Sequence, residues 1–342
     1  MRMGNPMTKY IRSRAPLRIG LAGGGTDVDP YASEKGGCVL NTTINKYAYC
    51  TLTPREDNIM NVESKYYGRF KGSLKNRPFK LDGSMDLIKA VANHFEIDHG
   101  FDMTIQSDVP SGSGLGGSST MVVAMIAAIA NWTDCELSKY EIAKLSYNLE
   151  RKDIGLAGGH QDQYAAVFGG FNYIKLKDDK VEVKPVNICH DVVNELQCRS
   201  VLCYTKITRE SADIIRSQVE SMQKGSNESA LDASKLLARK IGKSLEQGNI
   251  DDAAEKLDES WTYKKQFSSK VTNRHIDKLY DIAKANGAIG GKVSGAGGGG
   301  FMYFICDYNK KPQVSAALKK AGAELAEFMF EPSGVTSWRY ER

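Results

Sequence analysis

The sequence predicts a two-domain protein of mixed α/β (α+β) class, with a cleft between the domains. Its 342 residues exceed what one compact core usually organises. The first half alternates short β-branched and aromatic runs with helical patterns, whereas the second half begins with consecutive helical patterns and ends in strands. We therefore expect an N-terminal domain over residues 1–195 and a C-terminal domain over residues 196–342, with the change near residues 190–200.

The elements follow in order along the chain. Residues 47–54, 101–107 and 170–176 are predicted strands, residues 86–95 form a predicted helix, and an apolar helix follows over residues 119–132. The next helix begins at Ser138, where Glu141 completes a capping box. After a strand at residues 200–204, four helical patterns occupy residues 208–286, and a strand, a glycine run, a strand, a helix and two strands close the chain. We leave the methionine-rich start, residues 1–10, out of this argument.

Composition excludes several classes of protein. Apolar residues at 41% and charged residues at 25% are typical of a globular chain. Seven scattered cysteines without a Cys-x-x-Cys pair indicate reduced packing residues rather than a disulfide framework or a zinc site. The longest apolar run, residues 121–130, is about half the length that a bilayer-spanning helix needs. We expect a soluble, cytoplasmic protein without a membrane partner.

The net charge of +5 is spread along the chain. No stripe of basic residues is interleaved with aromatics, so we expect no nucleic-acid partner, and the charge suits small anionic ligands equally well. Oligomeric state stays open between a monomer and a homodimer.

A glycine- and serine-rich segment runs from a predicted strand into the apolar helix. N–H groups at a helix start converge on an anion, the helix dipole adds partial positive charge, and glycine lets phosphate oxygens approach the backbone. A flexible surface turn is the alternative, but such turns rarely precede a strongly apolar helix. The predicted phosphate-binding residues, ahead of Thr120, are Pro110, Ser111, Gly112, Ser113, Gly114, Leu115, Gly116, Gly117, Ser118 and Ser119.

Two better-known anion loops fail on this segment. The P-loop pattern needs a lysine where Ser118 stands. The dinucleotide fingerprint is matched by Gly112, Gly114 and Gly117, with Asp134 at about the right distance, but a Rossmann unit needs a second strand before that acidic residue. The helix at residues 119–132 is followed directly by the helix that begins at Ser138, with no strand between them. The remaining interpretation is an anion-binding loop whose serines supply the side-chain ligands.

Two more glycine segments bracket the chain. Residues 22–27 close an apolar strand that contains Arg18, and residues 294–300 lie between two strand-like runs. Either one alone could be a bulge or a hairpin turn. Three such segments together favour a cleft in which the backbone closely approaches a polyphosphate and a polar acceptor.

Two carboxylates follow the phosphate-binding segment at a helix end and at the next helix start. Phosphoryl transfer needs a metal held by oxygen ligands and a carboxylate that orients or deprotonates the attacking hydroxyl, and Glu150 and Asp162 could fill these roles. Asp162 could also be only a helix N-cap. Arg18 would keep the aspartate ionised and neutralise charge on the transferred group, or be an ordinary strand residue.

With these residues the chain resembles the GHMP kinases, named for galactose, homoserine, mevalonate and phosphomevalonate kinases. The resemblance covers nearly the whole chain. Its motifs are Arg14-Ala15-Pro16-Leu17-Arg18 through Asp27, the segment 110–120, and Lys292-Val293-Ser294-Gly295-Ala296-Gly297-Gly298. It implies a two-domain fold with a ferredoxin-like second half, and ATP and Mg²⁺ as cofactors. It also implies Asp162 as the catalytic aspartate, Arg18 as its cationic partner, Glu150 with Ser118 as metal ligands, and Asp27 as a contact to substrate hydroxyls.

Within the family, the interval from Glu150 to Asp162 and Gln163 is similar to that of the sugar 1-kinases. The Leu-Ala-Gly-Gly-Gly-Thr-Asp and Gly-His-Gln-Asp-Gln-Tyr-Ala-Ala segments resemble bacterial kinases that phosphorylate the anomeric hydroxyl of D-glycero-D-manno-heptose 7-phosphate, for nucleotide-activated heptose synthesis. The phosphate that such a sugar already carries would need additional cationic residues to bind it. Lys206, Thr208 and Arg209 could supply them, or could be an ordinary solvated helix start.

The expected substrate-binding residues come from all three motifs and from the segments between them. They are Gly24, Gly25, Thr26, Asp27, His160, Gln163, Lys206, Thr208, Arg209, Lys292, Ser294 and Gly295.

Two departures bear on the substrate and on the metal. The family's usual Gly-Leu-Gly-Ser-Ser-Ala is Gly-Leu-Gly-Gly-Ser-Ser here, so Ser118 becomes the expected metal ligand, with Ser119 not excluded. Gly24 and Gly25 replace the galactokinase Glu-His, which argues against galactose. The alternatives are a kinase of fucose, another sugar or phosphomevalonate, and a non-catalytic sensor of ATP and sugar.

Overall fold

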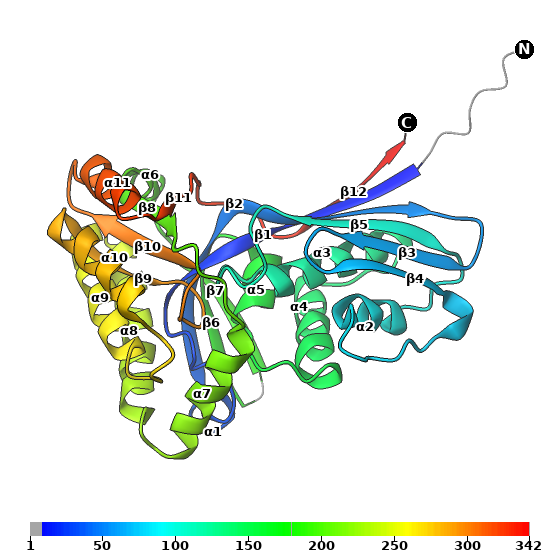
Figure 1. The fold of residues 1–342 in the computed structure, drawn as a ribbon, viewed down its shortest axis with the longest axis horizontal. Coiled ribbons are helices and arrows are strands. Elements are labelled where there is room, and N and C mark those ends of the chain that lie inside the picture. The colour runs from blue at the N-terminus through cyan, green and yellow to red at the C-terminus, as the bar shows by residue number, and fades with distance from the viewer. Residues whose placement is uncertain (1–8, 179, 342) are drawn as a thin grey trace, which may run out of the picture.

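The computed structural model describes residues 9–178 and 180–341. The chain forms two β-sheets, each with its own helices, which make the right and left lobes of the ribbon in Figure 1. Of the start that we set aside, residues 1–8 lie outside the described residues. Two lobes of mixed helix and strand confirm the predicted fold class.

The larger sheet has eight strands and contains β1 to β7, the described strands of the first half, together with β12. Its order is β12-β1-β2-β5-β3-β4, and β6 pairs with both β2 and β7. All its pairs are antiparallel except β3 with β5. The strands are β1 (Lys9–Ala22), β2 (Gly37–Pro54), β3 (Ile59–Ser64), β4 (Gly68–Ser73), β5 (Phe101–Ser107), β6 (Phe171–Lys177), β7 (Lys180–Pro185) and β12 (Thr336–Glu341).

The helices of this lobe include the apolar one that the sequence predicts. It is α3, and it is buried along most of its length because it packs against β1, β2, α4 and α5. None of the helices within residues 9–178 and 180–341 has the length and apolar character needed to cross a bilayer. The lobe contains α1 (Tyr31–Lys35), the 3₁₀ turn η1 (Leu74–Asn76), α2 (Asp86–His94), α3 (Gly117–Trp132), α4 (Lys139–Asn148), the π-helical turn η2 (Leu149–Asp153) and α5 (Gln161–Phe168).

Helix α4 begins as the sequence predicts. The Ser138 hydroxyl accepts from the Glu141 N–H, and the Glu141 carboxylate accepts from the Ser138 N–H. Helix α3 leads into α4 without an intervening strand. The structure therefore lacks the second strand of a Rossmann unit at this place, in agreement with the sequence argument.

The smaller sheet has four antiparallel strands in the order β11-β8-β10-β9. Counted from one to four along the chain, this is the order 4-1-3-2, and the succession βαββαβ is that of a ferredoxin-like fold. The implied fold of the second half is confirmed. Its elements are α6 (His190–Arg199), β8 (Ser200–Tyr204), α7 (Ser211–Gln223), α8 (Glu228–Glu246), α9 (Ile250–Lys264), α10 (Arg274–Ala285), β9 (Ala288–Val293), β10 (Phe301–Cys306), α11 (Lys311–Lys320) and β11 (Glu324–Leu325).

The last strand, β12, returns to the first sheet. It pairs antiparallel with β1 from Lys9 opposite Glu341 to Arg14 opposite Thr336, so the two ends of the described chain lie side by side (Figure 1). The pairing satisfies backbone groups along an edge of β1 that would otherwise be open. The domain division at residue 195 stays a prediction, because the closing strand belongs to the sheet of the first half.

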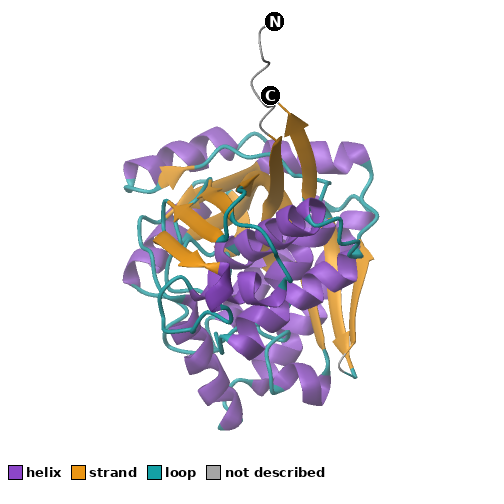
Figure 2. Ribbon diagram, turned by 90° about the vertical axis from the view of Figure 1, so that its right-hand side faces the viewer, coloured by secondary structure: helices purple, strands orange, loops and turns teal. Residues whose placement is uncertain are grey.

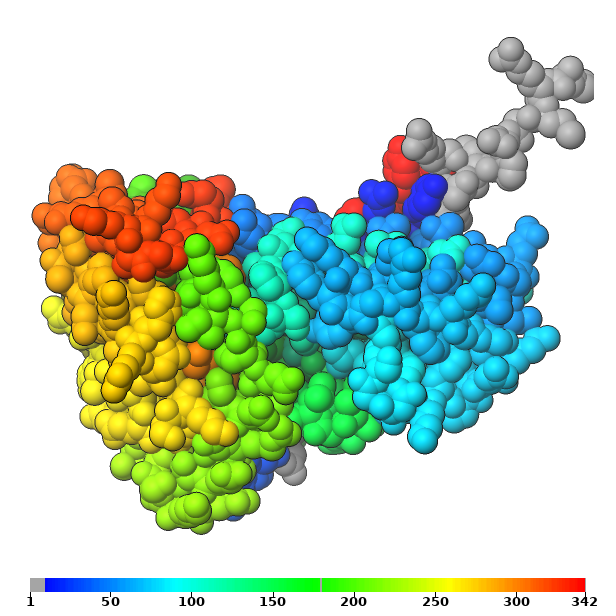
Figure 3. All heavy atoms as spheres, viewed as in Figure 1, coloured from blue at the N-terminus to red at the C-terminus, as the bar shows by residue number. Residues whose placement is uncertain are grey.

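The lobes share part of one hydrophobic core. Leu17, Ile19 and Leu21 of β1 belong to the same buried cluster as Ile241 of α8 and Tyr303 of β10. Figure 2 shows helices packed beside the strands, with some strands at the right-hand edge and the top left uncovered, and Figure 3 shows the two lobes meeting along a band of side chains that includes α7. Because β1 packs against both lobes, its C-terminal end is held in place where the lobes meet.

All seven cysteines lie in the described part of the chain and are free. Cys38, Cys50, Cys203 and Cys306 are buried, as expected of packing residues, whereas Cys135, Cys189 and Cys198 are exposed. The packing interpretation therefore holds for the first group and is wrong for the second.

Candidate active site

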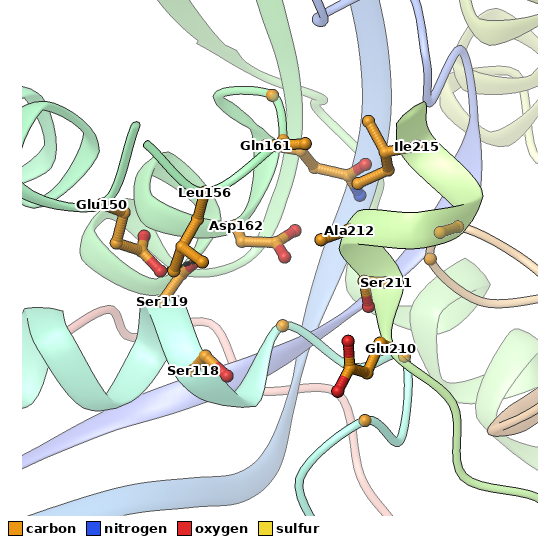
Figure 4. A pocket seen from close by; sticks show the side chains of 18 of the residues that line it. Ser118, Ser119, Glu150, Leu156, Gln161, Asp162, Glu210, Ser211, Ala212 and Ile215 are labelled. Atoms are coloured by element: carbon orange, nitrogen blue, oxygen red, sulfur yellow. Dashed lines mark hydrogen bonds between the residues drawn. The ribbon is translucent and has the colours of Figure 1, made fainter. Parts of the chain in front are cut away.

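A cavity of about 520 Å³ lies where the lobes meet. The first lobe contributes β1, the loop after it, the glycine- and serine-rich loop with the start of α3, and the loop into α5. The second lobe contributes the start of α7, the end of α9 and the loop after β9. In Figure 4 the labelled side chains of Glu150, Ser119 and Asp162 face those of Glu210 and Ser211 across the cavity.

The three glycine segments meet beside this cavity. Gly114 has a φ of +83°, and a Cβ there would lie 2.6 Å from the Ser294 carbonyl oxygen. A Cβ on Gly295 would lie 2.7 Å from the Gly114 oxygen. The segments at residues 112–117 and 294–300 therefore touch backbone to backbone, which only glycine allows. The Phe301 N–H also donates to the Ser113 oxygen at 2.9 Å.

Most of the predicted phosphate-binding segment borders the cavity. Residues 111–114 and 116–119 line it. Helix α3 begins at Gly117, so the first N–H groups of the helix lie at the cavity wall without partners inside the helix. Leu115 does not line the cavity: its side chain is fully buried, and its carbonyl oxygen accepts from the Arg18 N–H. Pro110 lines a smaller apolar pocket next to it.

Asp162 and Arg18 form an ion pair at the cavity wall. Asp162 Oδ1 accepts from Arg18 Nε at 2.8 Å and lies 2.7 Å from Arg18 Nη2. The Arg18 side chain is 5% exposed and that of Asp162 is 24% exposed, so the carboxylate is the group open to a ligand. His160, not Asp162, occupies the N-cap position of α5. The capping interpretation of Asp162 is therefore wrong, because its carboxylate pairs with Arg18 instead.

The arginine is in turn held by the central and the C-terminal glycine segments. Arg18 Nη1 donates to the Gly114 oxygen at 2.5 Å and to Ser294 Oγ at 3.2 Å. Ser294 Oγ also accepts from the Gly20 N–H. Every arm of the guanidinium has a partner, so its position is well determined.

Glu150 lies in the π-helical turn after α4 and is almost fully buried. Its Oε1 accepts from Ser119 Oγ at 3.0 Å, and its Oε2 accepts from Gln163 Nε2. Burial raises the pKa of Glu150, while Arg151 and the two hydrogen bonds act in the opposite direction. Ser118 points elsewhere, because its hydroxyl hydrogen-bonds the Tyr67 hydroxyl at 2.8 Å.

The loop after β1 supplies a second carboxylate. Asp27 Oδ2 accepts from the Gln161 N–H at 2.9 Å, and its Oδ1 accepts from the Gly25 N–H at 3.0 Å. Gly24, Gly25 and Asp27 line the cavity. Thr26 does not line it: its buried hydroxyl donates to the Gly23 oxygen and stabilises the turn.

Comparison with known proteins connects this arrangement to a family. Residues 85–170 match the GHMP kinases N terminal domain, and residues 242–324 match the GHMP kinases C terminal region. The chain is 42% identical over 337 residues to the D-glycero-alpha-D-manno-heptose 7-phosphate kinase of Campylobacter jejuni subsp. jejuni serotype O:2, covering 97% of this chain and 99% of that protein. The chain belongs to the GHMP kinase family.

Other similarities agree with this assignment. A crystal structure of a D-glycero-D-manno-heptose 1-phosphate kinase from Bacteriodes thetaiotaomicron has 36% sequence identity and a TM-score of 0.79, covering 96% of this chain and 98% of that one. The L-fucokinase/L-fucose-1-P guanylyltransferase of Bacteroides fragilis is 26% identical over 93% of this chain and 36% of its own length. The predicted family resemblance is confirmed, and the protein is an ATP-dependent kinase.

Two expected substrate contacts of this GHMP kinase lie just outside the cavity wall. His160 stacks on Tyr147 with ring centroids 3.7 Å apart, and burial lowers its pKa. Gln163 is buried and bonds Glu150 and Ser119. Both residues position the wall rather than form it.

In the third motif of the kinase, too, some expected substrate contacts line the cavity and others do not. Lys292 is buried and donates to the Gly20 oxygen at 2.8 Å, and burial, with Lys264 and Arg18 nearby, lowers its pKa. Gly295 lines the cavity, whereas Ser294 acts through Arg18.

The loop between β8 and α7 contributes one of its predicted residues to the cavity. Lys206 and Thr208 are exposed, and neither lines the cavity. Arg209 does line it: the guanidinium donates to the Gly297 oxygen and to Ser211 Oγ. Burial, with Arg18 nearby, lowers the pKa of Arg209 to about 10.

Sequence reasoning missed several residues of the cavity wall. Lys264, Gln161, Gln218, Arg151 and Tyr67 all line it. Gln161 is next to Asp162, which the sequence pattern indicated as a candidate. Lys264 is the last residue of an ordinary helix, where a lysine is expected because of the helix dipole alone. Only the packing of α9 against α8 and β9 turns its side chain toward the loop after β1.

Proposed function

We propose that this kinase transfers the γ-phosphoryl group of ATP to the anomeric hydroxyl of D-glycero-D-manno-heptose 7-phosphate, giving the 1,7-bisphosphate. The observation that carries the proposal is the ion pair of Asp162 with Arg18, which lies between the phosphate-binding segment and the loop with Gly24 and Asp27. The 42% identical relative, named for this substrate over nearly its whole length, supports the choice of acceptor.

On this proposal the segment 110–119 holds the phosphates of ATP. Amides at the start of α3 and the alternating positive φ angles of Gly112, Gly114 and Gly116 suit a triphosphate. The adjoining apolar side chains, Tyr66, Tyr67 and Met121 among them, would pack against the adenine ring. The cavity and this pocket adjoin at Ser111 and Gly117, which line both.

Asp162 would accept the proton of the anomeric hydroxyl while that oxygen bonds to the γ-phosphorus. The bond from the γ-phosphorus to the β–γ bridging oxygen then breaks, and ADP leaves with the electron pair. Arg18 orients the Asp162 carboxylate through contacts of 2.7 to 2.8 Å, and its positive charge would offset negative charge on the transferred group.

We also propose a magnesium site at Glu150 and Ser119. Mg²⁺ prefers oxygen ligands and is usually held by one or two protein groups together with substrate phosphates, and this carboxylate and hydroxyl lie 3.0 Å apart at the cavity wall. The residues therefore fit the ion, although the described residues hold no cluster of three or more His, Cys, Asp or Glu side chains arranged for a metal. A bound Mg²⁺ would neutralise phosphate charge. Ser118 remains the alternative ligand, but it contacts Tyr67 and not Glu150.

The acceptor sugar would lie against Gly24, Gly25 and Asp27. The two oxygens of Asp27 each hold one backbone N–H, so the carboxylate keeps a fixed orientation and retains lone pairs for sugar hydroxyls. A Cβ on Gly24 would already contact Gln161 Oε1 at 3.4 Å, so glycine keeps the backbone accessible at this position. A sugar phosphate is the proposed partner, and a cytoplasmic location stays a prediction.

The substrate can be tested with a panel of acceptors. The protein is incubated with ATP, Mg²⁺ and heptose 7-phosphate, heptose, fucose, galactose or phosphomevalonate, and ADP is measured. We expect the highest kcat/KM with the heptose 7-phosphate, and phosphorus NMR should locate the new phosphate on C1. ATP binding without ADP formation from any acceptor would favour the sensor instead.

The mechanism can be tested by Asp162→Asn. The amide oxygen can still accept from Arg18, so the site should keep its shape, but the proton acceptor is lost. We expect kcat to fall at least about a hundredfold, within the usual contribution of a general base, with an unchanged Kd for ATP. Asp281→Asn, on an exposed position of α10, is the matched control. Near-normal turnover of Asp162→Asn would remove Asp162 from the mechanism.

A further inference from the structure

Lys264, the last residue of α9, brings a buried ammonium group to the acceptor side of the cavity. The residue is 4% exposed and lines the cavity. Its Nζ donates to the Gly24 oxygen at 3.1 Å and to Gln218 Oε1 at 3.4 Å, and lies 4.5 Å from the centroid of the Phe267 ring. These contacts hold the group at the loop after β1 but do not neutralise it.

No carboxylate within salt-bridge distance of Lys264 occurs among residues 9–178 and 180–341. Asp27 is the nearby acid, and it favours the charged lysine, while Arg18 and Arg209 oppose it. Both Asp27 oxygens already accept backbone N–H groups. A buried ammonium without a counter-ion is costly, and an anionic ligand that pairs with it would offset this cost.

Gln161 supplies a second, independent donor at the same place. The residue is 7% exposed, and its Nε2 has no hydrogen-bond partner among the described residues. A Cβ on Gly20 would lie 2.8 Å from Gln161 Nε2, and a Cβ on Gly24 would lie 3.4 Å from its Oε1. The amide of Gln161 and the ammonium of Lys264 therefore approach Gly24 from different elements, α5 and α9. In Figure 4 the Gln161 amide lies on the far side of Asp162 from Ser118.

We propose that Lys264 Nζ and Gln161 Nε2 form an anion subsite for the phosphate that the acceptor already carries. This inference rests on the proposed function and deepens it: the anomeric end of the sugar meets Asp162, and the phosphorylated end meets Lys264. The subsite lies across Asp162 from the segment that holds ATP, so the kinase can require a phosphorylated sugar without competition from the nucleotide phosphates. Of the two cations that the sequence suggested, Lys206 has an exposed side chain outside the cavity wall, whereas Arg209 lines the cavity and donates to the Gly297 oxygen and Ser211 Oγ.

The test compares two acceptors that differ only in the phosphate. KM and kcat are measured for D-glycero-D-manno-heptose 7-phosphate and for D-glycero-D-manno-heptose, with wild type and Lys264→Met. We expect the KM for the phosphorylated sugar to rise roughly 10- to 100-fold, the loss expected for a charge-assisted hydrogen bond. The KM for the unphosphorylated sugar should change less than about threefold, within the usual context dependence of a neutral contact.

Two further variants make the result specific. Lys265→Met removes the neighbouring, exposed lysine and should leave both KM values unchanged. Gln161→Leu should selectively raise the KM for the phosphorylated sugar, by roughly tenfold as for one neutral hydrogen bond. This variant tests the subsite even if Lys264→Met does not fold. Equal effects of Lys264→Met on both sugars, or a selective effect of Lys206→Met instead, would overturn the proposal.

A binding measurement separates this subsite from the proposed reaction. With ADP and Mg²⁺ saturating the nucleotide site, inorganic phosphate is titrated into wild type and Lys264→Met in a calorimeter. We expect at least a roughly tenfold weaker Kd in the variant. If neither sugar is phosphorylated but this difference is found, the proposed function fails and the anion subsite stands. Equal Kd values would refute the subsite.

Discussion

Replacing Lys264 by methionine should stabilise the protein at neutral pH and not at alkaline pH. Methionine has a similar length and keeps the packing against Phe267, but it removes the buried charge. Burial, together with Arg209 and Arg18, lowers the pKa of Lys264 from 10.5 to about 8, against the opposing effect of Asp27. Lys292, which donates to Gly20, is the other buried amine near it.

The magnitude follows from this pKa. The unfolded chain binds a proton at Lys264 up to about pH 10.5 and the folded chain only up to about pH 8, so the wild type becomes more stable as pH rises between these values. Burying this lysine then costs about 3 kcal/mol of folding free energy at pH 7 and about 1 kcal/mol at pH 9.5. The variant leaves the Gly24 and Gln218 oxygens without this donor, an opposing loss of about 1 kcal/mol each.

Urea unfolding of the ligand-free protein, followed by circular dichroism at pH 7 and pH 9.5, measures this difference. We expect the advantage of Lys264→Met over wild type to shrink by about 2 kcal/mol between the two pH values, and to reverse sign at pH 9.5. The opposing hydrogen-bond loss cancels in the comparison because it is present at both pH values. Lys265→Met, which alters an exposed lysine, should show no such change. A pH-independent difference would mean that the ammonium is not destabilised by burial, and the argument for a missing counter-ion would fall.

Further predictions concern the metal site and the glycine contact. Ser119→Ala should raise the Mg²⁺ concentration for half-maximal activity roughly tenfold, because one oxygen ligand beside Glu150 is lost, whereas Ser118→Ala should change it less; a titration in which the order is reversed would favour Ser118 as the ligand. Gly114→Ala should lower both thermal stability and ATP affinity, since a Cβ at positive φ would lie 2.6 Å from the Ser294 oxygen. The expected destabilisation is about 2 kcal/mol, and a variant with the Tm and Kd of wild type would show that the two segments can separate freely.

Much of the local structure could be predicted because its causes are local. The strands at residues 101–107 and 200–204 have the predicted bounds, and the Ser138 capping box is present. Side chains within a few positions of each other determine such elements, so these elements can be predicted from the sequence. The predicted strand at residues 47–54 is the end of β2, which is 18 residues long because its earlier half pairs with β6, a partner more than a hundred residues away.

The sequence by itself determined the family and the three glycine segments, because the glycine and serine residues of each motif are neighbours in the chain and can be recognised without the fold. It also singled out Asp162, Arg18 and Glu150, which the structure brings to one cavity. Only the tertiary structure decided that Ser119, not Ser118, lies against Glu150, because the direction of each hydroxyl depends on how α3 packs. Only the tertiary structure, too, brought Lys264 beside Gly24: this contact joins residues 240 positions apart, and no local pattern encodes it.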